Sequence, residues 1–180
     1  MRHFALSAIG RDKPGIVAAV AAKLLKHGIN IEDSEMTILR GHFTMTLVVS
    51  APDEIEAGSL QVDLEAVRKR LGLDAISLDD LAEPEPARRT VPSHVVTVYG
   101  ADHPGIVHAV TASLAEQEIN ITDLTTRLVE QEDRDPLYLL TMEIVLPDAV
   151  EPNDLEAILK RVGDEQAVEV SVRPSDRDLL

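Results

Sequence analysis

Two copies of one short motif contain the residues of this sequence whose types and spacing suit the binding of a small charged molecule. The first copy, RDKPGIVAAVAAKLLKHGINIED, spans residues 11–33, and the second, ADHPGIVHAVTASLAEQEINITD, spans residues 101–123. With Gly10 aligned to Gly100, the copies share 14 identities in 24 positions. This self-similarity indicates that the chain contains a duplicated unit, so a site built by the motif would occur twice.

The motif could bind an anion because each Asp-x-Pro-Gly sequence stands directly before a segment with helical spacing of apolar residues. The first amides of a helix have no partners within it and carry the positive end of the helix dipole. They favour a carboxylate or phosphate by about 0.3–1 kcal/mol at an exposed site. Gly15 and Gly105 offer such an amide with no side chain in the way. Asp12 and Asp102 add a negative charge beside it, so the motif suits both charged groups of an amino acid.

Asn30 and Asn120 follow the helical segments, and we expect them at the same end of the sheet as the Asp-x-Pro-Gly loops. A structural role is the alternative for the whole motif, because aspartate is a common N-cap and asparagine tolerates the left-handed conformation at a helix exit. Gly28 also suits a helix exit. Glu118 holds the matching position, where a left-handed backbone would cost about 1 kcal/mol. The two loops could therefore differ in shape, leaving a site in only one of them.

The segments around the motif predict a βαββαβ order in each half of the chain. Apolar residues alternate in the predicted strands and recur every three or four residues in the predicted helices. In the first half, the strand and helix patterns consist of Phe4, Leu6, Ala8; Ile16, Val17, Val20, Leu24; Phe43, Met45, Leu47, Val49; and Leu60, Leu64, Val67, Leu71. In the second half, they consist of Val96, Val98; Ile106, Val107, Val110, Leu114; Leu140, Met142, Ile144, Leu146; and Leu155, Ile158, Val162.

These patterns predict an α+β fold with two ferredoxin-like domains in tandem, each an antiparallel four-stranded sheet with both helices on one face. The predicted domains are residues 1–81 and 93–174. Residues 82–92, AEPEPARRTVP, are predicted to form a linker because they are rich in proline and charge and lack apolar periodicity. Residues 175–180 form a predicted C-terminal tail.

The composition narrows the possible partners. The formal charge is −15, from 32 acidic and 17 basic residues, and such an anionic chain is repelled by nucleic acid and by anionic membranes. We therefore expect neither direct nucleic-acid binding nor membrane association. There is no cysteine, and the N-terminus lacks the apolar core of a signal peptide. We expect a cytoplasmic protein.

Other candidate chemistry is sparse. His103 and His108 are five residues apart, which is not the one-turn spacing of a helical metal pair, and exposed or capping histidines are expected instead. The sequence contains no nucleophile elbow, P-loop or dinucleotide motif, so we expect no cofactor, no metal and no catalytic activity. An acidic insert at residues 129–137 lengthens the second predicted hairpin and could contact a partner.

The Asp-x-Pro-Gly-Ile-Val and Ile-Asn-Ile-x-Asp segments, set in a βαββαβ unit, resemble the ACT domain. The tandem arrangement resembles the two-domain regulators of the glycine cleavage system transcriptional repressor family. This resemblance implies amino-acid sensing through the loop after the first strand, the helix start and the turn into the second strand. The residues it implicates are Asp12, Pro14, Gly15, Ile16, Asn30 and Ile31 in the first copy, and Asp102, Pro104, Gly105, Ile106, Asn120 and Ile121 in the second.

The leading hypothesis is a non-catalytic regulatory protein that binds a small amino acid and modulates a protein partner. Sites of the resembled family often form at a domain interface, so pairing of the two units would decide whether a pocket closes. The chain could also form a homodimer. Two alternatives remain open. The first is a structural adaptor for oligomerisation whose loops only cap helices, and the second is a small hydrolase or transferase related to ACT-bearing enzymes.

Overall fold

The computed structural model of the chain describes residues 1–82, 91–131 and 134–175. Nearly all of the predicted linker, residues 82–92, and of the predicted tail, residues 175–180, lies outside the described residues. The linker and the tail therefore remain predictions. None of the helices in the described part of the chain combines the length and the apolar composition needed to cross a bilayer.

The chain divides by its contacts into unit 1, Met1–Pro86, and unit 2, Ala87–Leu180. The described residues of each unit follow the predicted βαββαβ order. The elements of unit 1 are β1 Arg2–Arg11, α1 Ile16–Lys26, β2 Asn30–Leu39, β3 His42–Ala51, α2 Ala57–Leu71 and β4 Leu73–Leu81. The elements of unit 2 are β5 His94–Ala101, α3 Ile106–Glu116, β6 Asn120–Gln131, β7 Arg134–Val145, α4 Pro152–Glu165 and β8 Val168–Pro174.

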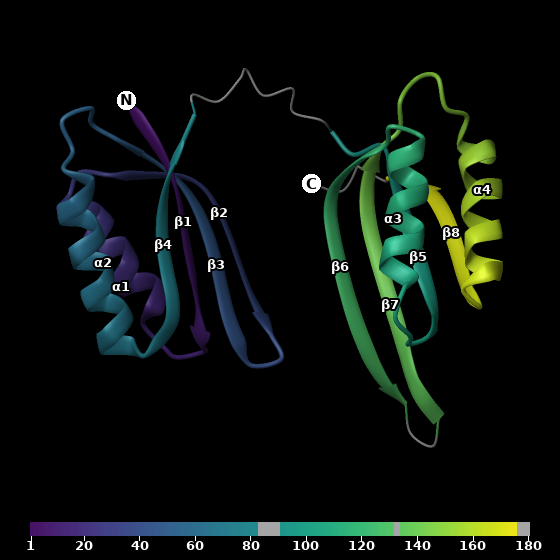
Figure 1. Cartoon of the computed structure of the whole chain (residues 1–180), viewed down its shortest axis with the longest axis horizontal. Helices are drawn as coiled ribbons and strands as arrows, with labels where there is room; N and C mark the ends of the chain where they lie inside the picture. Colours follow the sequence, from purple (N-terminus) through teal and green to yellow (C-terminus); the bar gives the residue numbers. More distant parts are fainter. Residues whose placement is uncertain (83–90, 132–133, 176–180) are drawn as a thin grey trace. The chain divides into compact units, whose positions relative to one another are not determined.

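Both sheets are antiparallel and have the same strand arrangement. The strand order is β2-β3-β1-β4 in unit 1 and β6-β7-β5-β8 in unit 2. The registers also correspond, since Leu6 lies opposite Leu47 and Val98 lies opposite Leu140. Within each unit, the two helices cover one face of the sheet (Figure 1). The predicted fold class is therefore confirmed.

The core of unit 1 forms from the alternating strand residues and one stripe of each helix. In β1 and β3 the side chains that face the helices are buried, as the alternation predicts. In α1 the buried stripe consists of Ile16, Val20 and Leu24, each at most 1% exposed. Full burial of such an aliphatic side chain contributes about 1.5–3 kcal/mol, so this stripe fixes α1 on the sheet. The Asp-x-Pro-Gly loop is positioned as a consequence.

In unit 2, α4 faces its sheet with a different stripe from the one that the sequence predicts. The predicted stripe is Leu155, Ile158 and Val162, whereas the buried stripe is Leu155, Leu159 and Gly163. Ile158 and Val162 are only partly buried. The helix that these residues predict is present, and its buried face differs from the apolar pattern because Gly163 lies in that face. A glycine in that face lets the helix backbone approach the strand beneath it.

The aligned glycines Gly72 and Gly163 have different structural roles. Gly72 ends α2 in the left-handed conformation, with φ 67°. Gly163 lies inside α4, where an added Cβ would come 2.7 Å from the Val168 carbonyl oxygen. The chain instead turns at Ala167, which has φ 52°. The second helix of unit 2 therefore runs past the point where α2 stops and packs closely on β8.

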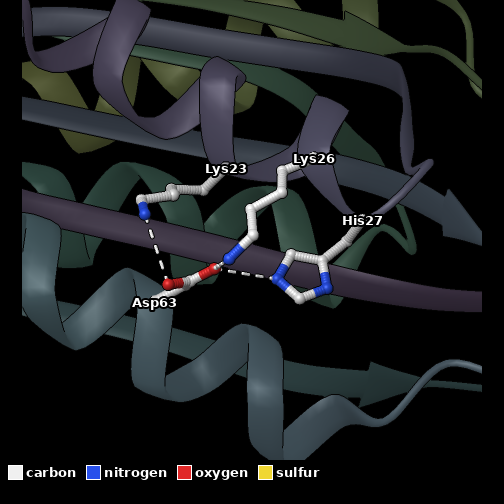
Figure 2. A network of polar contacts seen from close by, with 4 residues as sticks. All are labelled: Lys23, Lys26, His27 and Asp63. Carbon is white, nitrogen blue, oxygen red and sulfur yellow. Dashed lines mark hydrogen bonds and ion pairs between the residues drawn. The ribbon is translucent and has the colours of Figure 1, made fainter.

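An ion-pair cluster joins α1 to α2 in unit 1 (Figure 2). The carboxylate of Asp63 on α2 accepts hydrogen bonds from Lys26 Nζ at 2.7 Å, from His27 Nε2 at 3.0 Å and from Lys23 Nζ at 3.2 Å. These three donors hold the pKa of Asp63 far below its ordinary value of 3.8, with the Lys26 bond as the largest cause. Lys23, Lys26 and His27 align with Ser113, Glu116 and Gln117 of unit 2. None of these three is cationic, so unit 2 lacks the cluster.

The hairpin of unit 2 is longer than that of unit 1. β6 and β7 each have 12 residues, whereas β2 and β3 each have 10. This agrees with the longer hairpin expected from the insert at residues 129–137. Residues 132–133 lie outside the described residues, and contact of the insert with a partner remains a prediction.

Candidate functional site

The candidate site of unit 1 is the loop between β1 and α1, at the start of the helix. Gly15 is the N-cap of α1 and has φ 92°, a left-handed conformation that residues with a side chain rarely adopt. Gly105 has the same role before α3, with φ 111°. The first helical hydrogen bonds run from Ala19 and Ala109 back to these glycines. The duplicated motif therefore builds the same backbone in both units.

No side chain in the described part of the chain caps α1 or α3. The alternative in which Asp12 and Asp102 cap the helices is wrong, because the N-cap positions belong to Gly15 and Gly105. The Asp12 backbone amide instead donates to the Gly41 carbonyl, at 3.3 Å, in the β2–β3 turn. The first-turn amides are thus left for another acceptor, as the anion-binding hypothesis requires.

An open hollow lies beside each helix start. The hollow of unit 1 has a volume of about 480 Å³ and that of unit 2 about 600 Å³. Both hollows contain the aspartate, the glycine and the buried isoleucine of the motif. The lining residues of unit 1 are Asp12, Lys13, Gly15, Ile16, Val17, Ala18, Met36 and Phe43. Those of unit 2 are Asp102, His103, Pro104, Gly105, Ile106, Val107, His108 and Tyr138.

Access to the two glycines differs. An added Cβ on Gly15 would meet no atom within 4 Å, whereas one on Gly105 would lie 3.4 Å from Gln166 Oε1. Gln166 is the residue that follows α4. The helix start is therefore open in unit 1 and narrowed by one side chain in unit 2.

The residue after the motif aspartate binds the C-terminal end of the second helix in both units. Lys13 Nζ donates to the Leu71 carbonyl oxygen at 3.0 Å. His103 Nε2 lies 2.6 Å from the Gln166 carbonyl oxygen, and its Nδ1 lies 3.1 Å from that of Pro104. The hydrogen bond to the Gln166 carbonyl is the main cause that raises the pKa of His103 above 6.5. His103 therefore caps the C-terminus of α4, and His108 is exposed, as the expectation of capping or exposed histidines has it.

The structure separates the asparagines from the helix starts. Asn30 pairs with Ser50, which pairs with His3 near the beginning of β1. Asp12 follows the other end of β1, and α1, with 11 residues, carries the chain back by roughly 16 Å. The expectation that Asn30 lies at the same end of the sheet as Asp12 is wrong.

The same correction applies to unit 2, where Asn120 pairs with Val145 and Gly100 lies opposite Tyr138. Ile31 lines a separate apolar recess of about 140 Å³ between α1 and the sheet. This recess shares Val17 and Met36 with the hollow at the helix start. Its Ile121 counterpart is partly buried against the core of unit 2.

The two helix exits have the same shape despite their different residues. Gly28 has φ 67° and Glu118 has φ 56°. The amides of Ile29 and Ile119 each bond at 3.0 Å to the carbonyl five residues before them. The expectation of differently shaped loops is therefore wrong. Burial of Ile29 and Ile119, at 7% and 5% exposure, fixes the path of the chain in spite of the backbone strain at Glu118.

Some lining residues were not identified from the sequence. Phe43 and Tyr138 enter the hollows because they lie opposite Gly10 and Gly100 at the ends of β1 and β5. The sequence did contain an indication of both residues. Phe43 begins the alternating pattern of the first hairpin, and Tyr138 stands directly before the pattern of the second. Met36 was missed because every residue of β2 is exposed, so its strand pattern gives no indication of a pocket.

Comparisons with known proteins cover both units. The family model for the ACT domain matches residues 2–76 and 94–173. Phosphoserine phosphatase SerB2 from Mycobacterium tuberculosis is 29% identical over 172 residues. That alignment covers 93% of this chain but only 39% of the phosphatase, so the chain spans well under half of that relative.

Two solved structures match the chain over almost its whole length. An unknown protein from Galdieria sulphuraria is 27% identical, with a TM-score of 0.77 and coverage of 97% of this chain and 98% of that one. A putative glycine cleavage system transcriptional repressor is 18% identical, with a TM-score of 0.72 and coverage of 97% of both chains. At 18% identity, the second likeness shows the shared fold.

Proposed function

The chain belongs to the ACT domain family, and on this premise we propose that it is a non-catalytic regulator that binds a small amino acid at its helix starts. The family indicates a regulatory, amino-acid-binding role. The finer proposal is that ligand binding changes the affinity of the chain for a regulated protein, as in a repressor of the glycine cleavage type. With a net charge of −15, such an effect would pass through a protein partner instead of DNA.

The observation that carries the proposal is the open hollow beside an uncapped helix start, present in both units. The ligand carboxylate would accept hydrogen bonds from the amides of Gly15 and Ile16, where the helix dipole favours negative charge. The ammonium would lie near the Asp12 carboxylate. In unit 2, the corresponding groups are Gly105, Ile106 and Asp102.

Pro14 and Pro104 support this arrangement. Proline has no amide hydrogen and holds its φ near −65°, so it stiffens the approach to the helix without adding a competing donor. Both prolines are exposed beside the hollows. In unit 1, the apolar recess reached past Val17 and Met36 would accommodate the side chain of an aliphatic amino acid.

Asn30, Asn120 and Ile121 stand apart from this site within their own units, whereas Ile31 lines the apolar recess beside it. Because α1 separates Asn30 from the helix start, a small ligand held at Gly15 would contact such an asparagine only if it came from outside the same unit, and a second copy of the chain could supply it. A homodimer that completes the site in this way is part of the proposal. Sedimentation analysis with and without ligand tests it, and a monomer that binds amino acid at full affinity would contradict it.

Isothermal titration calorimetry of the purified chain against each of the twenty amino acids tests the proposal itself. We expect saturable binding of one or a few small amino acids. Asp12→Asn and Asp102→Asn preserve the side-chain shape but remove the charge that faces the ammonium. Each should weaken its site by roughly tenfold or more, since a hydrogen bond to a charged group contributes about 1.5–3 kcal/mol.

Asp79→Asn and Asp148→Asn are matched controls, because both aspartates are exposed and lie outside the two hollows. These variants should bind like the unaltered chain. Absence of heat with all twenty amino acids, together with unchanged thermal midpoints, would favour the adaptor alternative, because a ligand specific for the folded state must raise the midpoint.

A further inference from the structure

The imidazole of His103 lies between two backbone carbonyl oxygens in unit 2. Its Nε2 is 2.6 Å from the oxygen of Gln166, and its Nδ1 is 3.1 Å from that of Pro104. A carbonyl oxygen only accepts hydrogen bonds. A neutral imidazole has one N–H group, so it can satisfy only one of these contacts and turns a lone pair toward the other oxygen. The imidazolium donates to both.

The position of the ring at a helix terminus also favours the charged form. Gln166 immediately follows α4, where the unpaired carbonyls carry the negative end of the helix dipole. The ring thereby bridges the loop of the candidate site to the far end of the second helix. The Gln166 side chain lies on the same side, since its Oε1 is 3.4 Å from a Cβ placed on Gly105.

The titratable groups on the described elements beside this ring belong to the loop, to the end of α4 and to the hollow, whose lining includes His108 and Tyr138. Asp102, the preceding residue in the loop, favours the positive charge. Asp164 and Glu165 belong to the last turn of α4, but both are exposed and neither bonds to the ring. The bonds to Gln166 and Pro104 are the main causes that raise the pKa of His103, while partial burial opposes them.

Unit 1 makes the matching contact with a lysine instead of a histidine. Lys13 occupies the position of His103 and donates to the Leu71 carbonyl at the end of α2. An ammonium group only donates hydrogen bonds, whereas a neutral imidazole also carries a lone pair. The two site loops are therefore held by donors of different chemistry.

We propose that His103 is a protonation-dependent latch, which holds the Asp102–Gly105 loop against the C-terminus of α4 when charged and releases it when neutral. The latch makes unit 2 responsive to pH, whereas in unit 1 Lys13 makes the matching contact. The direction follows from linkage. The latch contributes fully to the stability of the loop below pH 6.5, the ordinary pKa of histidine, and its contribution is lost as the pH rises through the higher pKa of the folded protein.

The latch has a consequence for ligand affinity, and this part rests on the proposed function. A carboxylate bound at the amides of Gly105 and Ile106 would favour the ordered loop and the nearby positive charge. Binding to unit 2 should then be about fivefold or more tighter near pH 6 than near pH 8, at the lower end of the usual range for coupled sites. By reciprocity, the same ligand should raise the titration midpoint of His103.

Nitrogen-15 NMR of the full chain tests the latch without any ligand. We expect His103 to titrate with a midpoint above 6.5 and both of its ring nitrogens to carry protons below that midpoint. The amides of His103, Gly105 and Ala167 should shift with the same midpoint. In His103→Lys, which copies unit 1, these amide shifts should lose their pH dependence near neutrality while the fold is retained. A midpoint at or below 6.5, or amide shifts that persist unchanged in His103→Lys, would overturn the proposal.

Calorimetry at the two pH values separates this inference from the proposed function. If the NMR titration is as expected and no amino acid binds at either pH, the latch stands and the sensor proposal fails. If an amino acid binds unit 2 with equal affinity at both pH values while His103 titrates between them, the coupling to the ligand is refuted.

Discussion

Unit 1 and unit 2 share one backbone path but hold their candidate sites in place by different means. In both, a residue of the site loop binds the C-terminus of the second helix, through Lys13 in one unit and His103 in the other. The helix start is open at Gly15 and narrowed by Gln166 at Gly105. The comparison teaches that the loop geometry was retained after duplication while the contacts that stabilise it diverged.

The units differ in the same way in how their helices are joined. In unit 1, α1 and α2 are joined by the charge cluster around Asp63 (Figure 2). In unit 2, Gly163 lies buried in α4 and lets that helix pack closely on β8. The contact between the two helices of unit 1 thus depends partly on ionisation, whereas the packing of α4 on β8 depends on the small size of Gly163.

Among the substitutions considered, Gly163→Ala should have the largest effect on the stability of either unit. The added methyl would lie 2.7 Å from the Val168 carbonyl oxygen and 2.9 Å from Val170 Cγ2, so α4 must move away from β8. We expect a loss of about 1–3 kcal/mol in unit 2, the usual cost of an overpacked core. Chemical denaturation followed by unit-resolved hydrogen exchange measures it.

Gly58→Ala is the matched control for this substitution, because Gly58 lies in α2 and an added Cβ would meet no atom within 4 Å. It should leave stability unchanged or raise it by up to about 1 kcal/mol, since alanine is the better helix former. An equal loss in both variants would show that α4 does not pack as closely as the distances indicate.

Glu118→Gly should stabilise unit 2, by less than Gly163→Ala destabilises it. Glu118 adopts φ 56° at the exit of α3, so a glycine relieves roughly 1 kcal/mol of backbone strain. Gly28→Ala at the matching exit of α1 should destabilise unit 1 by a similar amount. If thermal unfolding gives both variants a midpoint below that of the unaltered chain, Glu118 must make a contact that outweighs its strain.

Asp63→Asn should lower the thermal midpoint of unit 1 by less than these backbone effects, because the cluster is partly exposed to solvent. The amide cannot balance the charges of Lys23 and Lys26. Differential scanning calorimetry at low and at high salt measures the change, which should shrink as salt screens the charges. Asp79→Asn is the control, and a drop as large as that of Asp63→Asn would argue against a specific cluster.

The smallest expected effect is a loss of stability of unit 1 at acidic pH. Because the pKa of Asp63 is lowered in the folded protein, its contribution to stability is present above its ordinary pKa of 3.8 and is lost as the pH falls below that value. Asp63→Asn should therefore flatten the acid limb of the stability profile of unit 1. Superimposable acid limbs for the variant and the unaltered chain would contradict this assignment.

The fold could be predicted from the sequence because each unit repeats the same local patterns. Strand alternation through Phe43, Met45, Leu47 and Val49 and the helical stripe through Ile16 determine which faces are buried, and the structure buries those faces. Such patterns are local and do not depend on how distant elements meet.

The errors arose where distant contacts decide the outcome. The end of the sheet at which Asn30 lies follows from the strand order, because a helix after β1 must return the chain before a parallel strand can begin. The roles of Gly72 and Gly163 differ because an added Cβ would meet the last strand of the unit at Gly163 but only the Lys13 side chain at Gly72. At Glu118, burial of the next residue overrides the local backbone preference.

The central claim is that an amino acid binds the uncapped amides at the two helix starts. An amide-resolved NMR titration of the unaltered full chain with a mixture of amino acids tests it most directly. We predict saturable shifts at Gly15 and Ile16 and at Gly105 and Ile106, with smaller changes elsewhere in the described residues. Saturable shifts confined to other residues, or no saturable shifts at all, would contradict the account.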